Sequence, residues 1–239
     1  MDINQDKIAL VTGASMGMGK AIVFALAKEG YRLIACARNQ DSLKQLQIEV
    51  QENIPNSEVF VQRCDFSLSS DVKDLTTWLE TNSLRVDVLV NNVGLFIPGS
   101  ILKEADDVLA KHMQVNLFTP YHLSVYVGKK MKERKSGHIF NISSVASRQA
   151  IASAGSYSIT KHALAGLTSV LREDLKKDNV KVTEIIPGST LTASWEGTTV
   201  PKDEFVLPED IAQALVAVLK MSKGANVDEI VIKPVKGQI

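Results

Sequence analysis

The chain has 239 residues, of which 45% are hydrophobic and 23% are charged, a composition typical of a globular protein with a substantial core. Lys plus Arg number 27 and Asp plus Glu also number 27, so the formal net charge is zero and no overall field favours a nucleic-acid partner. Stretch 1–7 lacks a basic segment followed by an apolar one, and no window approaches membrane-spanning length. We expect Cys36 and Cys64 to be buried reduced thiols, so the sequence predicts a cytoplasmic protein without a membrane partner or a metal site.

Strand and helix patterns alternate from one end of the chain to the other. Short apolar runs predict strands, and apolar residues at helical spacing predict the helices between them. We expect strands at 7–12, 32–37, 58–64, 86–91, 138–143, 181–186 and 229–232, and helices at 20–29, 41–52, 69–81, 105–113, 117–134, 157–177 and 208–221. Strands bridged by helices pair in parallel, and continuous apolar strands fit a sheet covered on both faces. The sequence therefore predicts a doubly wound α/β fold in a single domain over 1–239.

The longest irregular stretch late in the chain is 188–207. Loops at the carboxyl ends of parallel strands often build binding sites. We interpret this stretch as a substrate lid rather than as a linker between domains.

A glycine cluster, Thr-Gly-Ala-Ser-Met-Gly-Met-Gly at 12–19, lies between the first strand and the first helix. Glycine lets the chain turn sharply and brings bare backbone amides close to a pyrophosphate at the helix N-terminus. The cluster could be only a tight turn, but its position directly after the first strand favours nucleotide binding.

The second strand ends in Cys-Ala-Arg-Asn at 36–39, with no carboxylate. A carboxylate at this point would select NAD, whereas an arginine accommodates the 2′-phosphate of NADP. We therefore predict NADP(H) as the cofactor, with Arg38 on the 2′-phosphate and Ser15 assisting. The alternative is a solvated arginine at the start of a helix.

Tyr157 and Lys161 are four residues apart on a predicted helix and so share one face. A fixed cation beside a phenol stabilises the phenolate and lowers the tyrosine pKa, so this pair could exchange a proton near neutral pH. Taken alone, the spacing is more often that of an exposed surface pair. Other motifs must support the catalytic interpretation.

These motifs occur in the order and approximate spacing of the short-chain dehydrogenases/reductases, which the chain resembles over about 7–232. The resemblance rests on the glycine loop, Asn-Asn-Val-Gly at 91–94, Asn116, Ser144, Tyr157, Lys161 and Pro187-Gly188. It implies a Rossmann-type doubly wound parallel sheet of seven strands with helices on both faces. It also implies hydride transfer between NADP(H) and a small carbonyl or alcohol.

The resemblance implies that Tyr157 is the acid/base that exchanges a proton with the substrate oxygen. Lys161 would lower the tyrosine pKa and hydrogen-bond the nicotinamide ribose, and Ser144 would hold the substrate oxygen. Ser143 is the competing serine, but Ser144 has the spacing to Tyr157 that is usual in the family. Asn116 would support a water-linked proton path to Lys161, and it could also be a helix-bend or capping residue, because a side-chain amide can bind backbone and water together.

The resemblance also implies the residues that line the cofactor. Asp65 would contact adenine, although it could instead cap the helix that begins near Ser69. Asn91 and Gly94 would lie along the adenosine and its ribose, and the turn after 186 beside the nicotinamide. The predicted cofactor set is Gly13, Ser15, Gly17, Met18, Gly19, Arg38, Asp65, Asn91, Gly94, Tyr157, Lys161, Pro187, Gly188 and Thr192.

Three positions depart from the family pattern. Val93 replaces the alanine more often found in the Asn-Asn-Ala-Gly motif, which alters packing rather than chemistry. Met16 stands where many NADP-preferring members carry a basic residue, so Arg38 would act without a second cation. Segment 226–234 lacks the Asp-Gly-Gly ending common among acyl-carrier-protein reductases, and is similar to members acting on small carbonyls or hydroxy acids.

A substrate pocket is predicted from the loops around these motifs, and its apolar majority suggests a ketone or aldehyde with a hydrophobic body. Arg148 could bind a carboxylate or phosphate, or be a surface arginine. Trp195 could close over the substrate or anchor the lid. The pocket candidates are Leu95, Phe96, Arg148, Ile151 and Trp195.

Helices 117–134 and 157–177 carry more apolar residues than one sheet face needs. The surplus includes Tyr121, Val125, Leu164, Leu167 and Leu171. It predicts a homodimer or homotetramer, which the resemblance also implies. The alternative function is a dinucleotide-binding regulator or scaffold without turnover. The presence of all four proton-transfer residues favours the enzyme, because binding alone does not require them.

Overall fold

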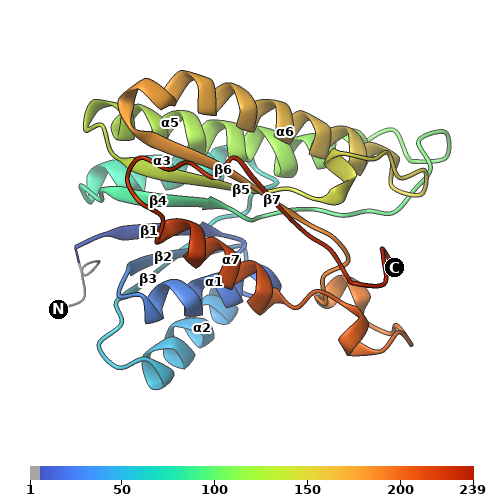
Figure 1. The fold of residues 1–239 in the computed structure, drawn as a ribbon, viewed down its shortest axis with the longest axis horizontal. Helices are drawn as coiled ribbons and strands as arrows, with labels where there is room; N and C mark the ends of the chain where they lie inside the picture. Colours follow the sequence, from blue (N-terminus) through green and yellow to red (C-terminus); the bar gives the residue numbers. More distant parts are fainter. Residues whose placement is uncertain (1–5) are drawn as a thin grey trace.

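Seven parallel strands form one sheet in the order β3-β2-β1-β4-β5-β6-β7 (Figure 1). The computed structural model describes residues 6–239; residues 1–5, part of the N-terminal stretch discussed above, lie outside the described residues. The strands are β1 (Ile8–Thr12), β2 (Arg32–Ala37), β3 (Val59–Arg63), β4 (Val86–Asn91), β5 (Gly137–Ile142), β6 (Val180–Pro187) and β7 (Glu229–Ile232). The strand order reverses between β1 and β4, which confirms the predicted doubly wound sheet and leaves a crevice at the carboxyl ends of these strands.

Helices cover both faces of the sheet, as predicted (Figure 1). One face carries α1 (Gly17–Lys28), α2 (Gln40–Asn53) and α7 (Pro208–Leu219). The other carries α3 (Ser69–Thr81), α5 (Thr119–Glu133) and α6 (Gly155–Leu175). Successive strand residues point to opposite faces, so in β1 Ala9 and Val11 join the first core while Ile8 and Leu10 join the second. A strand buried on both faces is apolar without alternation.

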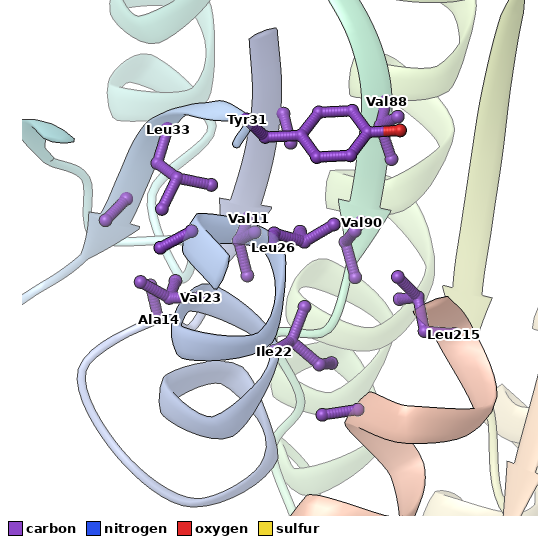
Figure 2. Packing of buried hydrophobic residues seen from close by; sticks show 14 of the residues in the cluster. Val11, Ala14, Ile22, Val23, Leu26, Tyr31, Leu33, Val88, Val90 and Leu215 are labelled. Carbon is purple, nitrogen blue, oxygen red and sulfur yellow. The ribbon is translucent and has the colours of Figure 1, made fainter. Parts of the chain in front are cut away.

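Helix α1 is fixed to the sheet by a dense apolar contact (Figure 2). Ile22, Val23 and Leu26 are fully buried on the helix face that packs against Val11 of β1 and Val90 of β4. Each such side chain contributes about 1.5–3 kcal/mol through burial. The contact therefore fixes the N-terminus of α1, and the glycine loop before it, at the carboxyl end of β1 in the middle of the sheet.

The helix around Asn116 differs from the sequence prediction of two separate helices. Helix α4 (Val108–Met113) runs directly into a π-helical segment, η1 (Gln114–Phe118), which continues into α5. Pro120 lies in the first turn of α5 and has no N–H to donate to the carbonyl of Asn116, four residues earlier. A π segment accommodates such a residue without ending the helix, and π segments occur often at functional sites.

The predicted lid, 188–207, contains two short 3₁₀ turns, η4 (Ala193–Trp195) and η5 (Lys202–Glu204). The Trp195 ring packs edge-on against Phe205, with 5.0 Å between ring centroids, and Phe205 is buried. This contact favours the role of Trp195 as an anchor of the segment to the core.

Both cysteines, Cys36 and Cys64, are free and buried, as predicted. Burial raises the pKa of Cys64 to about 12, so its thiol stays protonated. Within 6–239, no helix is long and apolar enough to cross a membrane. The same residues contain no group of three or more His, Cys, Asp or Glu side chains that could hold a metal ion.

Candidate active site

The glycine loop turns tightly at the carboxyl end of β1. Gly13 and Gly17 have φ values of +64° and +52°, which favour glycine. A Cβ on Gly19 would collide with the Gly13 carbonyl oxygen, so the helix can approach the strand only without a side chain there. Ser15 and Met18 are half-buried within the same loop and first helical turn. The loop thus presents bare backbone at the N-terminus of α1.

Two residues without a predicted role, Thr12 and Asn92, hold this loop. The Asn92 amide nitrogen donates to the carbonyls of Thr12 and Gly13, at 2.9 and 3.1 Å. The Thr12 hydroxyl accepts from the backbone N–H groups of Asn92 and Val93, both at 3.0 Å. Both residues lie inside motifs noticed in the sequence, but a motif does not tell which way a side chain points.

Asn91 was predicted to lie along the adenosine, but its side chain turns into the interior. Its amide nitrogen donates to Ser124 and to Asn141, at 2.9 and 2.8 Å, and the residue is 1% exposed. Asn141 in turn donates to Thr168 at 2.8 Å. A buried amide needs such partners, so the Asn91 side chain ties β4 to β5, α5 and α6 instead of facing a ligand.

Arg38 and Asp65 lie near each other at the carboxyl ends of β2 and β3. Arg38 is exposed. Asp65 Oδ1 accepts from the backbone N–H and the hydroxyl of Ser67, at 3.0 and 2.7 Å. These hydrogen bonds lower the Asp65 pKa, and the charge of Arg38 adds to the effect. Helix α3 begins after Leu68, so Asp65 orders the preceding turn and is not the helix cap.

Tyr157 lies in the first turn of α6, between two other rings. The Phe96 ring meets it edge-on at 5.0 Å between centroids, and the His112 ring lies at 6.1 Å. His112 is fully buried; its Nδ1 donates to the Val108 carbonyl and its Nε2 accepts from the Ile97 N–H. These two bonds identify the neutral tautomer, and burial lowers the His112 pKa further.

The pKa of Tyr157 shifts in the direction opposite to the sequence prediction. Burial raises it, and the hydrogen bond with Ser144 only partly opposes this effect. Lys161 Nζ lies 5.6 Å from the centre of the tyrosine ring and donates to the Ile142 carbonyl at 3.1 Å. The ammonium is thus directed at backbone rather than at the phenol oxygen, which explains why the predicted lowering is absent.

Lys161 itself is 4% exposed. Burial lowers its pKa to about 8, while the negative charge of Glu184 on β6 raises it. Gly94 lies opposite, where a Cβ would be 3.9 Å from Lys161 Nζ and 3.8 Å from Asn116 Oδ1. The catalytic candidates on η1 and α6 and the loop after β4 therefore meet at one point.

Asn116 fixes the loop after β4 through its side-chain amide. Its Oδ1 accepts from Leu95 N–H at 2.7 Å, and its Nδ2 donates to the Leu95 carbonyl at 2.9 Å and to Thr160 Oγ1 at 3.1 Å. Both amide protons are used by protein groups, so the side chain cannot also donate to water. Asn116 lies in the π-helical segment between α4 and α5.

The choice between the two serines falls on Ser144. Its hydroxyl accepts from Ala146 N–H at 3.1 Å and hydrogen-bonds Tyr157. The hydroxyl of Ser143 is buried and, within the described part of the chain, has no hydrogen-bond partner. Of the two serines, Ser144 is therefore the one that contacts Tyr157.

The segment after β6 reaches back to the glycine loop. A Cβ on Gly17 would lie 3.3 Å from Thr192 Cγ2, so Thr192 covers the start of α1. Pro187 ends β6, and the Gly188 N–H donates to the Ile232 carbonyl at 2.7 Å. These contacts bring the residues predicted beside a nicotinamide to the rim of the same crevice.

Two predicted pocket residues are engaged elsewhere. Arg148 Nη2 forms ion pairs with Glu184 at 2.9 Å and Glu229 at 2.6 Å, so its charge is already compensated and it is a poor anchor for an anionic substrate. Ile151 lines a separate apolar cavity of about 640 Å³ with Ile101 and Ile159. None of the catalytic candidates lines that cavity. Leu95 and Phe96 remain beside Tyr157.

The chain is similar to known proteins in both sequence and fold. A family model described as short chain dehydrogenase matches residues 7–202. An uncharacterized oxidoreductase of Staphylococcus aureus (strain MRSA252) is 32% identical over 238 residues, covering 98% of this chain and 100% of that protein. An alcohol dehydrogenase from the archaeon Thermococcus sibiricus, solved with 5-hydroxy-NADP, has a TM-score of 0.88, 28% identity and 98% coverage of both chains. A metagenomic short-chain oxidoreductase in complex with NADP has a TM-score of 0.85 and 28% identity, covering 98% of this chain and 99% of that one.

The N-terminus of α6 is capped from outside the helix. Its N-cap residue, Ala154, has no side-chain cap, and Glu104 supplies one instead: Oε1 accepts from Ser156 N–H at 3.2 Å and Oε2 from the Ser156 hydroxyl. A carboxylate also suits the positive end of the helix dipole. Glu104 thus joins the loop after β4 to the turn that carries Tyr157.

We expect Glu104→Ala to lower the free energy of unfolding by about 1–2 kcal/mol, because both Ser156 donors lose their partner. Urea denaturation measures the change. Asp106→Ala, which removes an exposed carboxylate from the same loop, is the control and should have little effect. Equal stability of the two variants would show that Glu104 does not cap the helix.

Proposed function

The chain belongs to the short-chain dehydrogenase family, and we propose that it is an NADP(H)-dependent oxidoreductase that interconverts a carbonyl and an alcohol of a small molecule. One observation carries the proposal: Ser144 and Lys161 both lie against Tyr157, at the crevice that the glycine loop borders. A protein that only binds a dinucleotide has no need of a hydroxyl pair and a buried ammonium in this arrangement.

The crevice fits a dinucleotide. The bare backbone at Gly13 and Gly19 leaves room for a pyrophosphate at the N-terminus of α1, where the helix dipole favours negative charge. The exposed guanidinium of Arg38 suits a 2′-phosphate. NADP and 5-hydroxy-NADP in the two similar solved structures support the same choice. When bound, the cofactor supplies or accepts the hydride.

The protein would handle the proton. Tyr157 and Ser144 share a hydrogen bond, so a substrate oxygen placed between them can accept a proton from the phenol while the serine hydroxyl stabilises developing negative charge. Lys161, held by the Ile142 carbonyl, lies close enough to stabilise the negative charge of the Tyr157 phenolate as it forms. Asn116 would then support the return of a proton to Lys161. Its backbone carbonyl is open to this role, because Pro120, four residues later, has no N–H to donate to it.

The substrate side of Tyr157 is apolar. Phe96 covers one edge of the tyrosine ring and is 47% exposed, and Leu95 is fixed beside it by Asn116. Because Arg148 is paired with two glutamates, none of the predicted pocket residues offers a free positive charge for an anionic substrate. We infer an uncharged ketone or aldehyde with a hydrophobic body as the substrate class.

We expect Tyr157→Phe to lower kcat about 10²–10⁴-fold, because the acid/base is lost while the ring packing is kept. NADPH oxidation across a carbonyl panel measures the rate, and NADPH fluorescence measures cofactor binding, which should persist. Tyr121→Phe, at an exposed tyrosine, is the control. Undiminished turnover in Tyr157→Phe would refute the acid/base role. NADPH binding by the wild type without oxidation by any carbonyl would point to a regulator.

We expect Arg38→Ala to raise the Kd for NADPH about tenfold to a hundredfold, because a charge-assisted contact contributes about 1.5–3 kcal/mol. The Kd for NADH should not change, since NADH has no 2′-phosphate. Arg63→Ala removes an exposed arginine that already pairs with Asp71 and serves as the control. A wild type that binds NADH more tightly than NADPH would sink the cofactor assignment.

The protein would also assemble through α5 and α6. Four of the predicted surplus residues pack within the chain: Leu164 and Leu171 are buried, and Val125 and Leu167 are half-buried. The apolar residues left exposed on η1, α5 and α6 are Phe118, Tyr121, Ile159 and Val170. An apolar face of this kind favours a second copy of the chain as its partner.

Light scattering should therefore give a mass that is a multiple of the 26.1 kDa chain. Val170→Asp should reduce that mass, because Val170 is 67% exposed in one chain and a charge there would oppose burial between two. Val235→Asp, at another exposed valine, is the control. A wild type that is monomeric at all concentrations would refute the assembly.

A further inference from the structure

Glu184 is a charged residue in an otherwise interior strand. It lies in the middle of β6 and is 1% exposed, and the residues before and after it, Thr183 and Ile185, are fully buried. Placing a carboxylate there is costly unless it is paired and hydrogen-bonded. Glu184 belongs to none of the motifs found in the sequence, so its role must be inferred from its partners.

The partners of Glu184 belong to the turn that begins with Ser144. Glu184 Oε2 accepts from Arg148 Nη2 at 2.9 Å. The Ser147 hydroxyl lies 3.4 Å from Glu184 Oε1 and 2.7 Å from the carbonyl oxygen of Ser144, to which it donates. The 3₁₀ turn η2 (Val145–Ser147), with Ser144 as its N-cap and Arg148 as its C-cap, is thereby fastened to β6 at its C-terminal end.

Glu184 is also the charged neighbour of Lys161. The Lys161 ammonium donates to the carbonyl of Ile142, which is paired across the sheet with Ile185, the residue after Glu184. Tyr157 faces Lys161 from its own helix, while Asn116 and Gly94 face it from η1 and the loop after β4. The negative charge of Glu184 raises the Lys161 pKa against the effect of burial.

Arg148 does not cancel this charge. Its guanidinium is shared between Glu184 and Glu229, which lies at 2.6 Å on β7. The three groups together carry one net negative charge. That charge is held on the buried side by Glu184, since Glu229 is 45% exposed and screened by water.

We propose that Glu184 is a positioning residue of the active site, which holds the Ser144 turn through Ser147 and Arg148 and supplies the counter-charge to the buried Lys161 ammonium. The proposal rests on the proposed function, because it gives that site a residue that touches neither substrate nor cofactor. A purely structural ion pair would hold the strand and the turn together but would leave the protonation of Lys161 unchanged. The two roles therefore separate when charge is removed without removing contacts.

Two variants make this separation. Glu184→Gln keeps an acceptor for Arg148 and Ser147 but removes the charge, whereas Glu184→Ala removes both. Glu173→Gln is the control, because it removes an exposed α6 carboxylate that pairs with Lys176 and leaves Arg148 and Glu184 untouched.

We expect the alkaline loss of kcat to begin about one pH unit lower in Glu184→Gln, because a nearby opposite charge shifts a pKa by about 1–3 units. Lys161 supports the reaction as an ammonium, so activity falls as pH rises through its pKa of about 8, and removing Glu184 moves that point downward. At acidic pH Glu184→Gln should retain the wild-type kcat. Glu184→Ala should lose kcat at every pH, with KM little changed, and Glu173→Gln should keep the wild-type profile.

The titration of Lys161 can be followed without any turnover. In protein labelled with ¹³C at lysine Cε, the Lys161 signal, identified by its absence in Lys161→Met, should titrate at lower pH in Glu184→Gln than in the wild type. Identical midpoints would overturn the proposal. Full kcat in Glu184→Ala at acidic pH would overturn the role in the Ser144 turn. Because the NMR measurement needs neither cofactor nor substrate, its outcome is independent of whether the proposed reductase activity is found.

Discussion

Burial of the Lys161 ammonium is the constraint around which the site is organised. A cation that is 4% exposed needs partners for its protons and its charge, and here the Ile142 carbonyl provides the first and Glu184 the second. These partners lie on β5 and β6, so the lysine can be buried only where α6 crosses the carboxyl ends of these strands. That is also the place where a doubly wound sheet offers a crevice.

The same helix is held from the other side by the loop after β4. Glu104 caps its first turn, Asn116 fixes Leu95 and donates to Thr160, and Phe96 packs on the Tyr157 ring. The loop after β4 therefore both lines the apolar pocket and holds the proposed acid/base, Tyr157, in position. A change in that loop made to fit another substrate would also move the tyrosine, which couples specificity to rate.

Local patterns predicted most of the fold and the position of the site. Tyr157 and Lys161 share a face because they are four residues apart on one helix, and the glycine loop follows from steric rules at single residues. What the sequence did not reveal depends on contacts between distant segments. Arg148 and Glu184 are 36 residues apart, and Asn91 and Asn141 are 50 apart. Whether an arginine binds a ligand or a buried carboxylate cannot be read from its neighbours in the chain.

The difference in the Tyr157 pKa carries a further consequence for the direction of the proposed reaction. A phenol whose pKa is raised by burial remains protonated at neutral pH, and a protonated phenol is the form that a carbonyl reduction requires. Alcohol oxidation would need the phenolate, which the buried site disfavours unless further positive charge arrives with the cofactor. Lys161 then acts less as a group that ionises Tyr157 in advance than as one that compensates the phenolate once the proton has left. On this argument the free protein is prepared for reduction, and the counter-charge on Glu184 keeps Lys161 able to complete it.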